Sequence, residues 1–258
     1  MIPRLDKDWG EQVAVVTGAG STRGIGRETA LHFGRLGASV VAIDRDPIVG
    51  EVAAQIRAEG SKAIAITLDV TKDVEIQRAL DQVLNEFGHI DILVNNAGIT
   101  RPNSILNISR SEWELVLATD LTSSFVFTQE VLPAMMKRKY GRIINLSSIS
   151  GERGGVQNGC HYSAAKAGVM GLTKHVAREM GGYGITCNAV SPGLIETDFG
   201  GFTEGDAGER RALLMKEIPA GRSGSAEEVA ATICFLASPA AGYITGEIVD
   251  VNGGWHID

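Results

Sequence analysis

The feature that most restricts the fold of this chain is a regular alternation of short apolar runs with helical patterns. Seven runs rich in β-branched residues span 13–17, 39–44, 63–69, 91–96, 141–148, 184–191 and 247–251. Most are apolar throughout, which is typical of parallel strands covered by helices on both faces. Amphipathic segments such as 74–87 separate them. The pattern predicts an α/β fold, a doubly wound, Rossmann-like parallel sheet of about seven strands with helices on both faces.

Length and composition fit one domain of this kind. The chain has 258 residues, of which 44% are hydrophobic and 21% charged, enough for a sizeable core. Because no repeat, charge block or low-complexity linker divides it, we predict a single domain over residues 1–258. The net charge of −7 argues against a general nucleic-acid-binding or anionic-membrane surface.

The sequence also bears on compartment and metal binding. The first residues, MIPRLDKDWGEQ, hold no apolar stretch that could act as a signal peptide. No run approaches the roughly 18 apolar residues of a membrane-spanning helix, so we expect a cytoplasmic protein. Cys160, Cys187 and Cys234 are far apart, and no closely spaced His/Cys set suggests zinc. We therefore expect reduced thiols and no metal site.

The first predicted strand ends in a turn rich in glycine. The stretch VAVVTGAGSTRGIGRETA runs from Val13 to Ala30. Without Cβ atoms the backbone can approach a phosphate, whose charge the free amides and dipole of the following helix attract. A turn packed tightly for structural reasons would use glycine as well, so this motif alone leaves both interpretations open.

A second motif, SSISGERGGVQNGCHYSAAKAG, carries groups suited to proton transfer. Tyr162 and Lys166 are four residues apart in a helical pattern and so share one face, while Ser148 ends the preceding strand. A free tyrosine, with a pKa of about 10, is a poor base at neutral pH, but a nearby cation favours its phenolate. The three residues predict a site that moves an alcohol proton during hydride transfer.

Together these motifs resemble the short-chain dehydrogenase/reductase family, from Val13 to Gly254 and including NAVSPGLIETD and ITGEIVDVNGG. The resemblance implies hydride transfer between a nicotinamide cofactor and a secondary alcohol or ketone, with Ser148 holding the substrate oxygen. It also implies a homo-oligomer, either a tetramer or a dimer. The rival is a nucleotide-binding protein that kept the fold and lost turnover, although such a binder would not need the catalytic set.

The glycine turn departs from the family fingerprint, T-G-x-x-x-G-x-G, by two extra residues. This chain has Thr-Gly at 17–18, then five residues, then Gly-Ile-Gly at 24–26. A register that begins at Gly20 restores the spacing but loses the Thr-Gly start. We prefer the insertion, and we expect the extra residues to bulge near the adenosine side of the cofactor.

The resemblance places the cofactor along the carboxyl ends of the strands. Asp44 would accept hydrogen bonds from the adenosine ribose and repel a 2′-phosphate, whereas Arg23 and Arg45 could pair with that phosphate. We give Asp44 more weight and predict NAD, with NADP left open. Asn95 is either a sheet-stabilising residue or a ligand contact. The predicted cofactor-binding residues are Gly18, Ser21, Thr22, Arg23, Gly24, Ile25, Gly26, Asp44, Arg45, Asp69, Val70, Asn96, Ala97, Gly98, Tyr162, Lys166, Pro192, Gly193, Ile195 and Thr197.

A further departure lies beside the predicted chemistry. The segment LATDLTSSF puts Asp120 where the family usually has asparagine, whose main-chain carbonyl holds a water that contacts the lysine in a proton relay. We therefore add Asp120 to the catalytic residues Ser148, Tyr162 and Lys166. We expect its side chain to turn into polar backbone rather than toward the tyrosine; the rival is that Asp120 is itself a relay base.

Two loops are expected to meet a small-molecule substrate. Residues about 198–216 resemble a mobile lid, because four glycines loosen them. The other loop carries the polar residues Glu152, Arg153, Gln157, Asn158 and His161. This polarity favours a sugar, polyol or hydroxy acid; the alternative is a 3-oxoacyl thioester, because that family branch is similar throughout. We interpret His161 as a helix-start or pocket-edge residue rather than a second base.

Overall fold

One parallel sheet organises the computed structural model, which describes residues 9–199 and 213–257. The strand order is β3-β2-β1-β4-β5-β6-β7, and every pairing is parallel. The strands are β1 (Val13–Thr17), β2 (Ser39–Asp44), β3 (Ala63–Thr67), β4 (Ile92–Asn95), β5 (Gly141–Leu146), β6 (Ile185–Pro192) and β7 (Ile248–Val251). The doubly wound, Rossmann-like sheet of seven strands is therefore confirmed. Most of the predicted lid, residues 200–212, lies outside the described residues.

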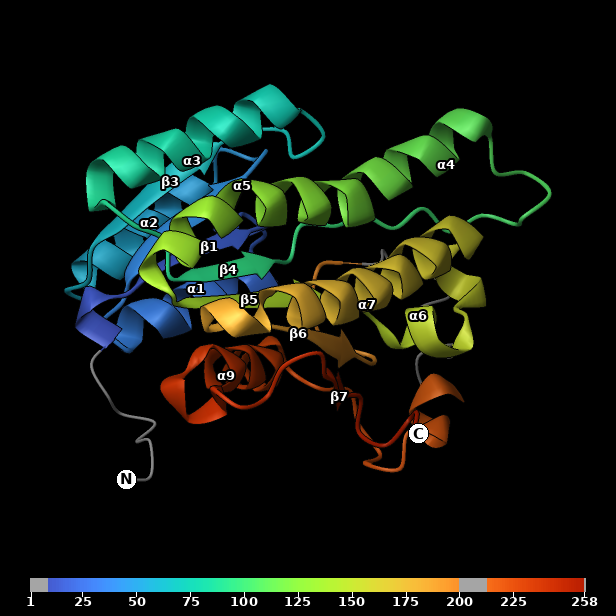
Figure 1. The fold of residues 1–258 in the computed structure, drawn as a ribbon. Coiled ribbons are helices and arrows are strands. Elements are labelled where there is room, and N and C mark those ends of the chain that lie inside the picture. Colours follow the sequence, from blue (N-terminus) through green and yellow to red (C-terminus); the bar gives the residue numbers. More distant parts are fainter. Residues whose placement is uncertain (1–8, 200–212, 258) are drawn as a thin grey trace.

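Helices cover both faces of this sheet (Figure 1). One face carries α1 (Ile25–Arg35), α2 (Val49–Ala58) and α9 (Ala226–Ala237), and the other carries α3 (Asp73–Phe87), α5 (Ser123–Arg138) and α7 (Cys160–Met180). Shorter elements are α4 (Arg110–Leu117), α6 (Ile149–Arg153), the π-helix η2 (Ala118–Thr122), and the 3-10 turns η1 (Trp9–Glu11), η3 (Val156–Asn158), η4 (Gly181–Tyr183) and η5 (Pro239–Ala241). Across the described ranges, no helix has both the length and the apolar character needed to cross a membrane.

The central strands are largely apolar because they face two cores, whereas β3 and β7 at the two edges of the sheet are less buried. In β1, Ala14 and Val16 pack in the core under α1, α2 and α9, whereas Val13 and Val15 pack in the core under α3, α5 and α7. Successive strand residues point to opposite faces, so a strand buried on both sides has apolar residues at successive positions rather than at alternate ones. All five residues of β1 are accordingly buried.

Two predicted strands extend too far at their carboxyl ends. The predicted ranges 63–69 and 141–148 each continue two residues beyond the last residue of β3 and β5. Asp69 and Ser148 occupy those extra positions, and both line the cleft described below. One more backbone hydrogen bond to the neighbouring strand follows each strand, from Leu68 to Asp44 and from Ser147 to Val190, and the pairing ends before Asp69 and Ser148.

The strand order reverses at β1 and β4: β2 and β3 lie on one side of this pair, and β5 to β7 lie on the other. A group of hydrogen bonds joins the ends of the two strands at this point. The Thr17 hydroxyl accepts from the backbone N–H groups of Asn96 and Ala97, both at 3.0 Å. The Asn96 side-chain amide donates to the carbonyls of Thr17 at 2.9 Å and Gly18 at 3.0 Å. In open α/β sheets, ligands bind in the crevice beyond such a switch point.

Candidate active site

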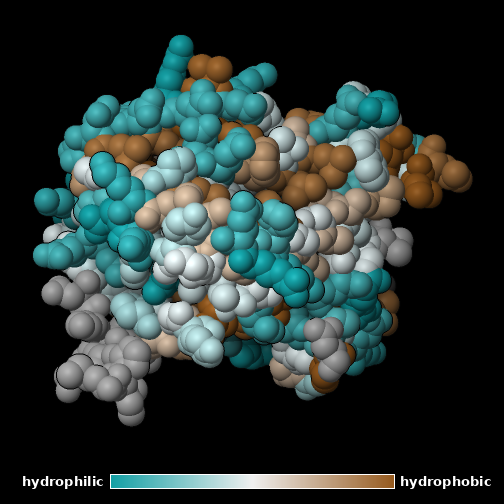
Figure 2. Space-filling view, viewed as in Figure 1, coloured by the Kyte–Doolittle hydropathy of each residue, from teal (hydrophilic) through white to brown (hydrophobic). Residues whose placement is uncertain are grey.

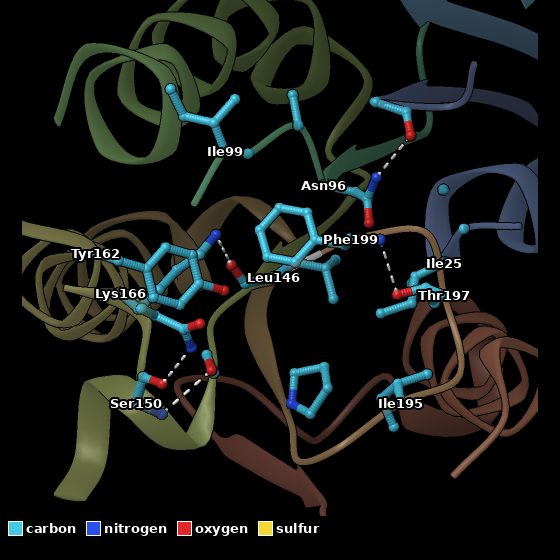
Figure 3. A pocket seen from close by; sticks show the side chains of 18 of the residues that line it. Ile25, Asn96, Ile99, Leu146, Ser150, Tyr162, Lys166, Ile195, Thr197 and Phe199 are labelled. Atoms are coloured by element: carbon cyan, nitrogen blue, oxygen red, sulfur yellow. Dashed lines mark hydrogen bonds between the residues drawn. The ribbon is translucent and has the colours of Figure 1, made fainter. Parts of the chain in front are cut away.

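A cleft of about 850 Å³ opens at the carboxyl ends of the strands. Among its lining residues are all the predicted catalytic and cofactor-binding residues except Thr22, Arg23 and Asp120. Figure 3 shows Ile25, Asn96 and Thr197 on one side of this cleft and Tyr162 and Lys166 on the other. The structure therefore gathers residues that are far apart in the chain into one site.

The glycine turn forms a close-packed cradle at one end of the cleft. Gly18 has a φ of +69°, which a residue with a side chain rarely adopts. A Cβ at Gly26 would collide with the Gly18 carbonyl and the Asn96 side chain. Helix α1 begins after Gly24 with no side-chain cap, which leaves amide donors and the positive end of the helix dipole at the cleft. This cradle fits a diphosphate group.

The extended glycine turn contacts the segment that follows β6. Thr22 Oγ1 donates to Asp198 Oδ2 at 2.6 Å, the Arg23 N–H donates to the same oxygen at 2.8 Å, and Arg23 Nε donates to Oδ1 at 3.0 Å. The hydrogen bond from Thr22 contributes most to lowering the pKa of Asp198. Thr22 and Arg23 are thus anchored to the segment after β6, while Gly20 of the same turn donates to Asp44 at the end of β2. The Arg23 guanidinium is paired with Asp198 and does not line the cleft. The position of the extra residues relative to the adenosine stays a prediction.

Two carboxylates lie at the carboxyl ends of the neighbouring strands β2 and β3. Asp44, at the end of β2, accepts from the N–H groups of Gly20 at 2.7 Å and Asp46 at 3.0 Å. Asp69, beyond β3, accepts from both the N–H and the hydroxyl of Thr71, at 2.9 and 2.8 Å. The backbone hydrogen bond from Thr71 is the main cause that lowers the pKa of Asp69. Both side chains are therefore held in place at the edge of the cleft by backbone N–H groups.

Ser148, Tyr162 and Lys166 come together at the other end of the cleft. Tyr162 and Lys166 lie in the first two turns of α7, where their side chains are only 5% and 4% exposed. Lys166 Nζ donates to the Leu146 carbonyl at 2.9 Å (Figure 3) and lies 5.5 Å from the centre of the Tyr162 ring. Ser148 is the N-cap of α6, and its oxygen accepts from the Ser150 N–H at 3.1 Å.

The pKa of Tyr162 is raised in this site. Burial is the largest cause, the negative charge of Asp120 adds to it, and a hydrogen bond with the Ser148 side chain opposes both. The tyrosine is therefore a phenol at neutral pH in the protein without bound ligands. A phenol is a proton donor, so the resting site is prepared to protonate a substrate oxygen.

Asp120 lies behind Lys166 in the π-helix η2, and its side chain is 1% exposed. The Ile99 N–H donates to its Oδ1 at 2.9 Å, which is the backbone contact we expected. Its Oδ2 lies 3.4 Å from Lys166 Nζ, so the side chain also forms an ion pair with the lysine. Burial raises the pKa of Asp120, and the Lys166 charge is the first of the causes that oppose this rise.

His161 and Asn95 have structural roles. His161 is fully buried, and its Nδ1 accepts from the Tyr162 N–H at 2.8 Å, so Nε2–H donates to Glu112 Oε1 at 3.2 Å. It begins helix α7, as interpreted from the sequence. Asn95 donates to Asn145 Oδ1 at 2.8 Å across the sheet, which supports the sheet-stabilising alternative.

Some residues near the chemistry carried no sequence signal. Glu112 is 49 positions from its partner His161, and nothing in its local pattern marks it. The Phe199 ring lies 5.9 Å from the Tyr162 ring, in front of the catalytic side chains in Figure 3. Outside the cleft, Glu152, Asp250 and His256 each offer one possible ligand atom within 4.8 Å of the others. The 2.9 Å contact between His256 and Glu152 accounts for two of them as an ion pair.

A parallel doubly wound sheet with a phosphate cradle at its switch point and a buried Ser–Tyr–Lys set defines a nucleotide-dependent oxidoreductase. Comparison with known proteins agrees. The family model described as enoyl-(acyl carrier protein) reductase matches residues 18–256. The chain belongs to the short-chain dehydrogenase/reductase family.

Its relatives cover nearly the whole chain. It is 42% identical over 246 residues to a 3-oxoacyl-[acyl-carrier-protein] reductase of Vibrio cholerae, covering 95% of this chain and 98% of that protein. A protein of the same description from Synechocystis is 44% identical over 246 residues, with 94% and 96% covered. A solved structure described as a putative gluconate dehydrogenase from Agrobacterium tumefaciens has a TM-score of 0.90 and 36% identity, and covers 96% of this chain and 97% of its own.

The close packing of the cradle predicts the effect of adding a methyl group to one of its glycines. Gly26→Ala should weaken NADH binding at least tenfold and lower the free energy of unfolding by about 1–3 kcal/mol, because backbone atoms block the new methyl group. Gly50→Ala on α2 is the matched control, because its new methyl group would meet nothing within 4 Å and Gly50 does not line the cleft. Fluorescence titration with NADH and urea denaturation measure both effects; equal losses in the two variants would contradict the cradle.

Proposed function

We propose that this protein interconverts a ketone and a secondary alcohol, with a nicotinamide cofactor held along the strand ends. The observation that carries the proposal is the placement of Ser148, Tyr162 and Lys166 in the cleft whose other end is the glycine cradle. When bound, the cofactor supplies or accepts the hydride. A protein that only bound nucleotides would have no use for a buried tyrosine beside a buried lysine.

The protein's own groups manage the proton. The Ser148 oxygen accepts from the Ser150 N–H, so the Ser148 hydroxyl proton is the group that can donate, to the Tyr162 oxygen in the protein without ligand and to the substrate oxygen when one is bound. The Tyr162 phenol can donate its proton to that oxygen during reduction or, as phenolate, remove it during oxidation. The Lys166 ammonium, held by the Leu146 carbonyl, supplies a positive field at the tyrosine.

We propose a 3-oxoacyl thioester as the substrate. The support is the repeated description of relatives at 41–44% identity as 3-oxoacyl-[acyl-carrier-protein] reductases. The sequence favoured a sugar, polyol or hydroxy acid instead, and these relatives support the alternative more strongly. A hydroxylated acid remains the second candidate. Arg153, Gln157 and Asn158 line the cleft, and the Agrobacterium structure is described as a putative gluconate dehydrogenase.

A substrate panel tests the activity and the mechanism together. We expect reduction of an acetoacetyl thioester with a higher kcat/KM than that of keto sugar acids. The variant Tyr162→Phe should lose at least about 10²-fold in rate because the proton donor is gone, while its NADH affinity stays unchanged. Spectrophotometric assays at 340 nm measure the turnover. Near-normal turnover by the variant contradicts the mechanism, and a preference for keto acids selects the second candidate.

We further propose NAD(H) as the preferred cofactor. Asp44 lines the cleft at the end of β2, with its carboxylate held toward the glycine turn by the Gly20 N–H. Arg23, one of the two arginines that could pair with a 2′-phosphate, instead contacts Asp198. The remaining candidate partner for that phosphate is Arg45.

The cofactor prediction can be tested with one substitution. The protein should show a higher kcat/KM with NADH than with NADPH, and Asp44→Ala should narrow the difference at least tenfold by removing the repelling charge. Arg45→Ala is the control, and it should reduce only the activity with NADPH. A tenfold or greater preference of the unmodified protein for NADPH would contradict this assignment.

The surface also supports assembly into dimers or tetramers. Large apolar side chains are exposed on α4, on α5 and in the loop before α4: Leu115, Phe125, Ile105 and Leu106. Figure 2 shows apolar surface over this part of the molecule, where a monomer would leave it in water. We propose that a second copy of this chain covers it.

Light scattering tests the assembly. The protein should be at least a dimer at micromolar concentration. Phe125→Glu should shift it toward the monomer, because the 46% exposed ring lies on the proposed contact surface. Circular dichroism controls for folding of the variant. A monomeric unmodified protein would contradict the proposal.

A further inference from the structure

A negatively charged carboxylate, that of Asp120, lies beside the Lys166 ammonium, whose proposed role needs a positive charge. A lysine that favours a phenolate acts through its net positive charge. Here Asp120 Oδ2 lies 3.4 Å from Lys166 Nζ, and both side chains are almost completely buried. At that distance in a water-poor environment, opposite charges interact strongly. The pair as a whole is close to neutral, so the field that reaches Tyr162 is weaker than that of a lone ammonium.

We infer that Asp120 is a positioning residue that holds Tyr162 in its phenol form to higher pH, by neutralising Lys166 with a buried carboxylate. Tyr162 thereby keeps the proton that ketone reduction needs, and oxidation of the alcohol, which needs the phenolate, requires a higher pH. This inference rests on the proposed function for its catalytic consequence, but not for the ionisation itself.

The groups around the tyrosine support this assignment. From α4, Glu112 is engaged with His161 on α7. From α6, Arg153 donates to the Trp255 carbonyl at 3.1 Å, and Glu152 pairs with His256. These charges have partners of their own.

Among the described residues, β6, β5 and α5, which also pack on α7, add no competing charge at this end. Strand β6 offers the Cys187 thiol, whose pKa burial raises to about 12, so it is neutral. On β5, Arg142 lies over the Tyr140 ring at the opposite end of the strand. On α5, Glu130 accepts from Gln77, and Arg138 pairs with Asp91. Within residues 9–199 and 213–257, Asp120 is the carboxylate paired with Lys166.

The geometry makes Asp120→Asn an informative substitution. An asparagine has nearly the same shape, and its single carbonyl oxygen can still accept from the Ile99 N–H, as Oδ1 does now. The Lys166 bond to the Leu146 carbonyl does not involve residue 120. What the substitution removes is the negative charge facing the ammonium. Lys166 then carries an uncompensated charge, which stabilises the phenolate of Tyr162.

The first measurement is the pH dependence of kcat/KM at saturating cofactor. Oxidation rises as pH passes the apparent pKa of Tyr162, because it needs phenolate, and reduction falls through the same pKa, because it needs phenol. Asp120→Asn should move both limbs at least about one pH unit lower, with the best rate changed less than about tenfold. Glu114→Gln, which removes an exposed carboxylate paired with Arg110 on α4, is the matched control and should move neither limb.

A second measurement needs no turnover. Tyrosinate absorbs near 295 nm, and the chain has four tyrosines, so the difference between each protein and its Tyr162→Phe counterpart isolates Tyr162. In the Asp120→Asn protein, Tyr162 should ionise at least about one pH unit below the pH at which it ionises in the protein that keeps Asp120. If this shift appears in a protein that turns over no ketone, the inference stands and the proposed function fails.

Two outcomes overturn the inference. Unshifted profiles and titrations in Asp120→Asn would mean that the carboxylate does not control the tyrosine. A loss of about 10²-fold at every pH, without a shift, would make Asp120 a relay base instead. Circular dichroism and NADH affinity of the variant separate both from simple misfolding.

Discussion

The site depends on the close approach of two strand ends, β1 and β4. The Thr17 hydroxyl and the Asn96 side chain tie these ends together, and the glycine turn packs so tightly against Asn96 that a Cβ at Gly18 or Gly26 would collide with it. This contact holds the amino end of α1 at the crevice, where its dipole can act on an anion. Because all strands are parallel, their remaining polar ends open onto the same edge, and the other functional groups need only follow a strand to reach it.

Burial then determines the chemistry at the far end of the cleft. A tyrosine in water is a phenol with an ordinary pKa, and burial alone raises that pKa further. The Asp120 carboxylate adds to this rise, and the Lys166 ammonium lies close to both groups, 3.4 Å from the carboxylate and 5.5 Å from the centre of the tyrosine ring. Both side chains of the pair also form hydrogen bonds with the backbone: the Leu146 carbonyl accepts from the lysine, and the Ile99 N–H donates to the aspartate. Such fixed partners prevent either charge from turning toward the substrate.

Much of this arrangement could be predicted, and particular residues show why the rest could not. The catalytic set follows a local pattern, since Tyr162 and Lys166 are one helical turn apart and Ser148 comes two residues after a strand. The insertion at Thr22 and Arg23 was visible, but its contact with Asp198, 175 residues beyond Arg23, was not. The backbone contact of Asp120 was expected, whereas its pairing with Lys166 depended on a distance that the sequence does not give. That pairing arises where η2 packs against α7, and no spacing within either segment encodes the distance between them.

By itself, the sequence determined the class of fold and the types of groups at the strand ends, because periodicity and glycine placement are local properties of a chain. It also determined that a phenol, an ammonium and a hydroxyl would share one site. Only the tertiary structure decided which charges meet: Asp198 with Arg23, Asp120 with Lys166, and Glu112 with His161. Coulomb energies depend on distance and on exclusion of water, and both are properties of packed surfaces, so they exist only once the elements have come together.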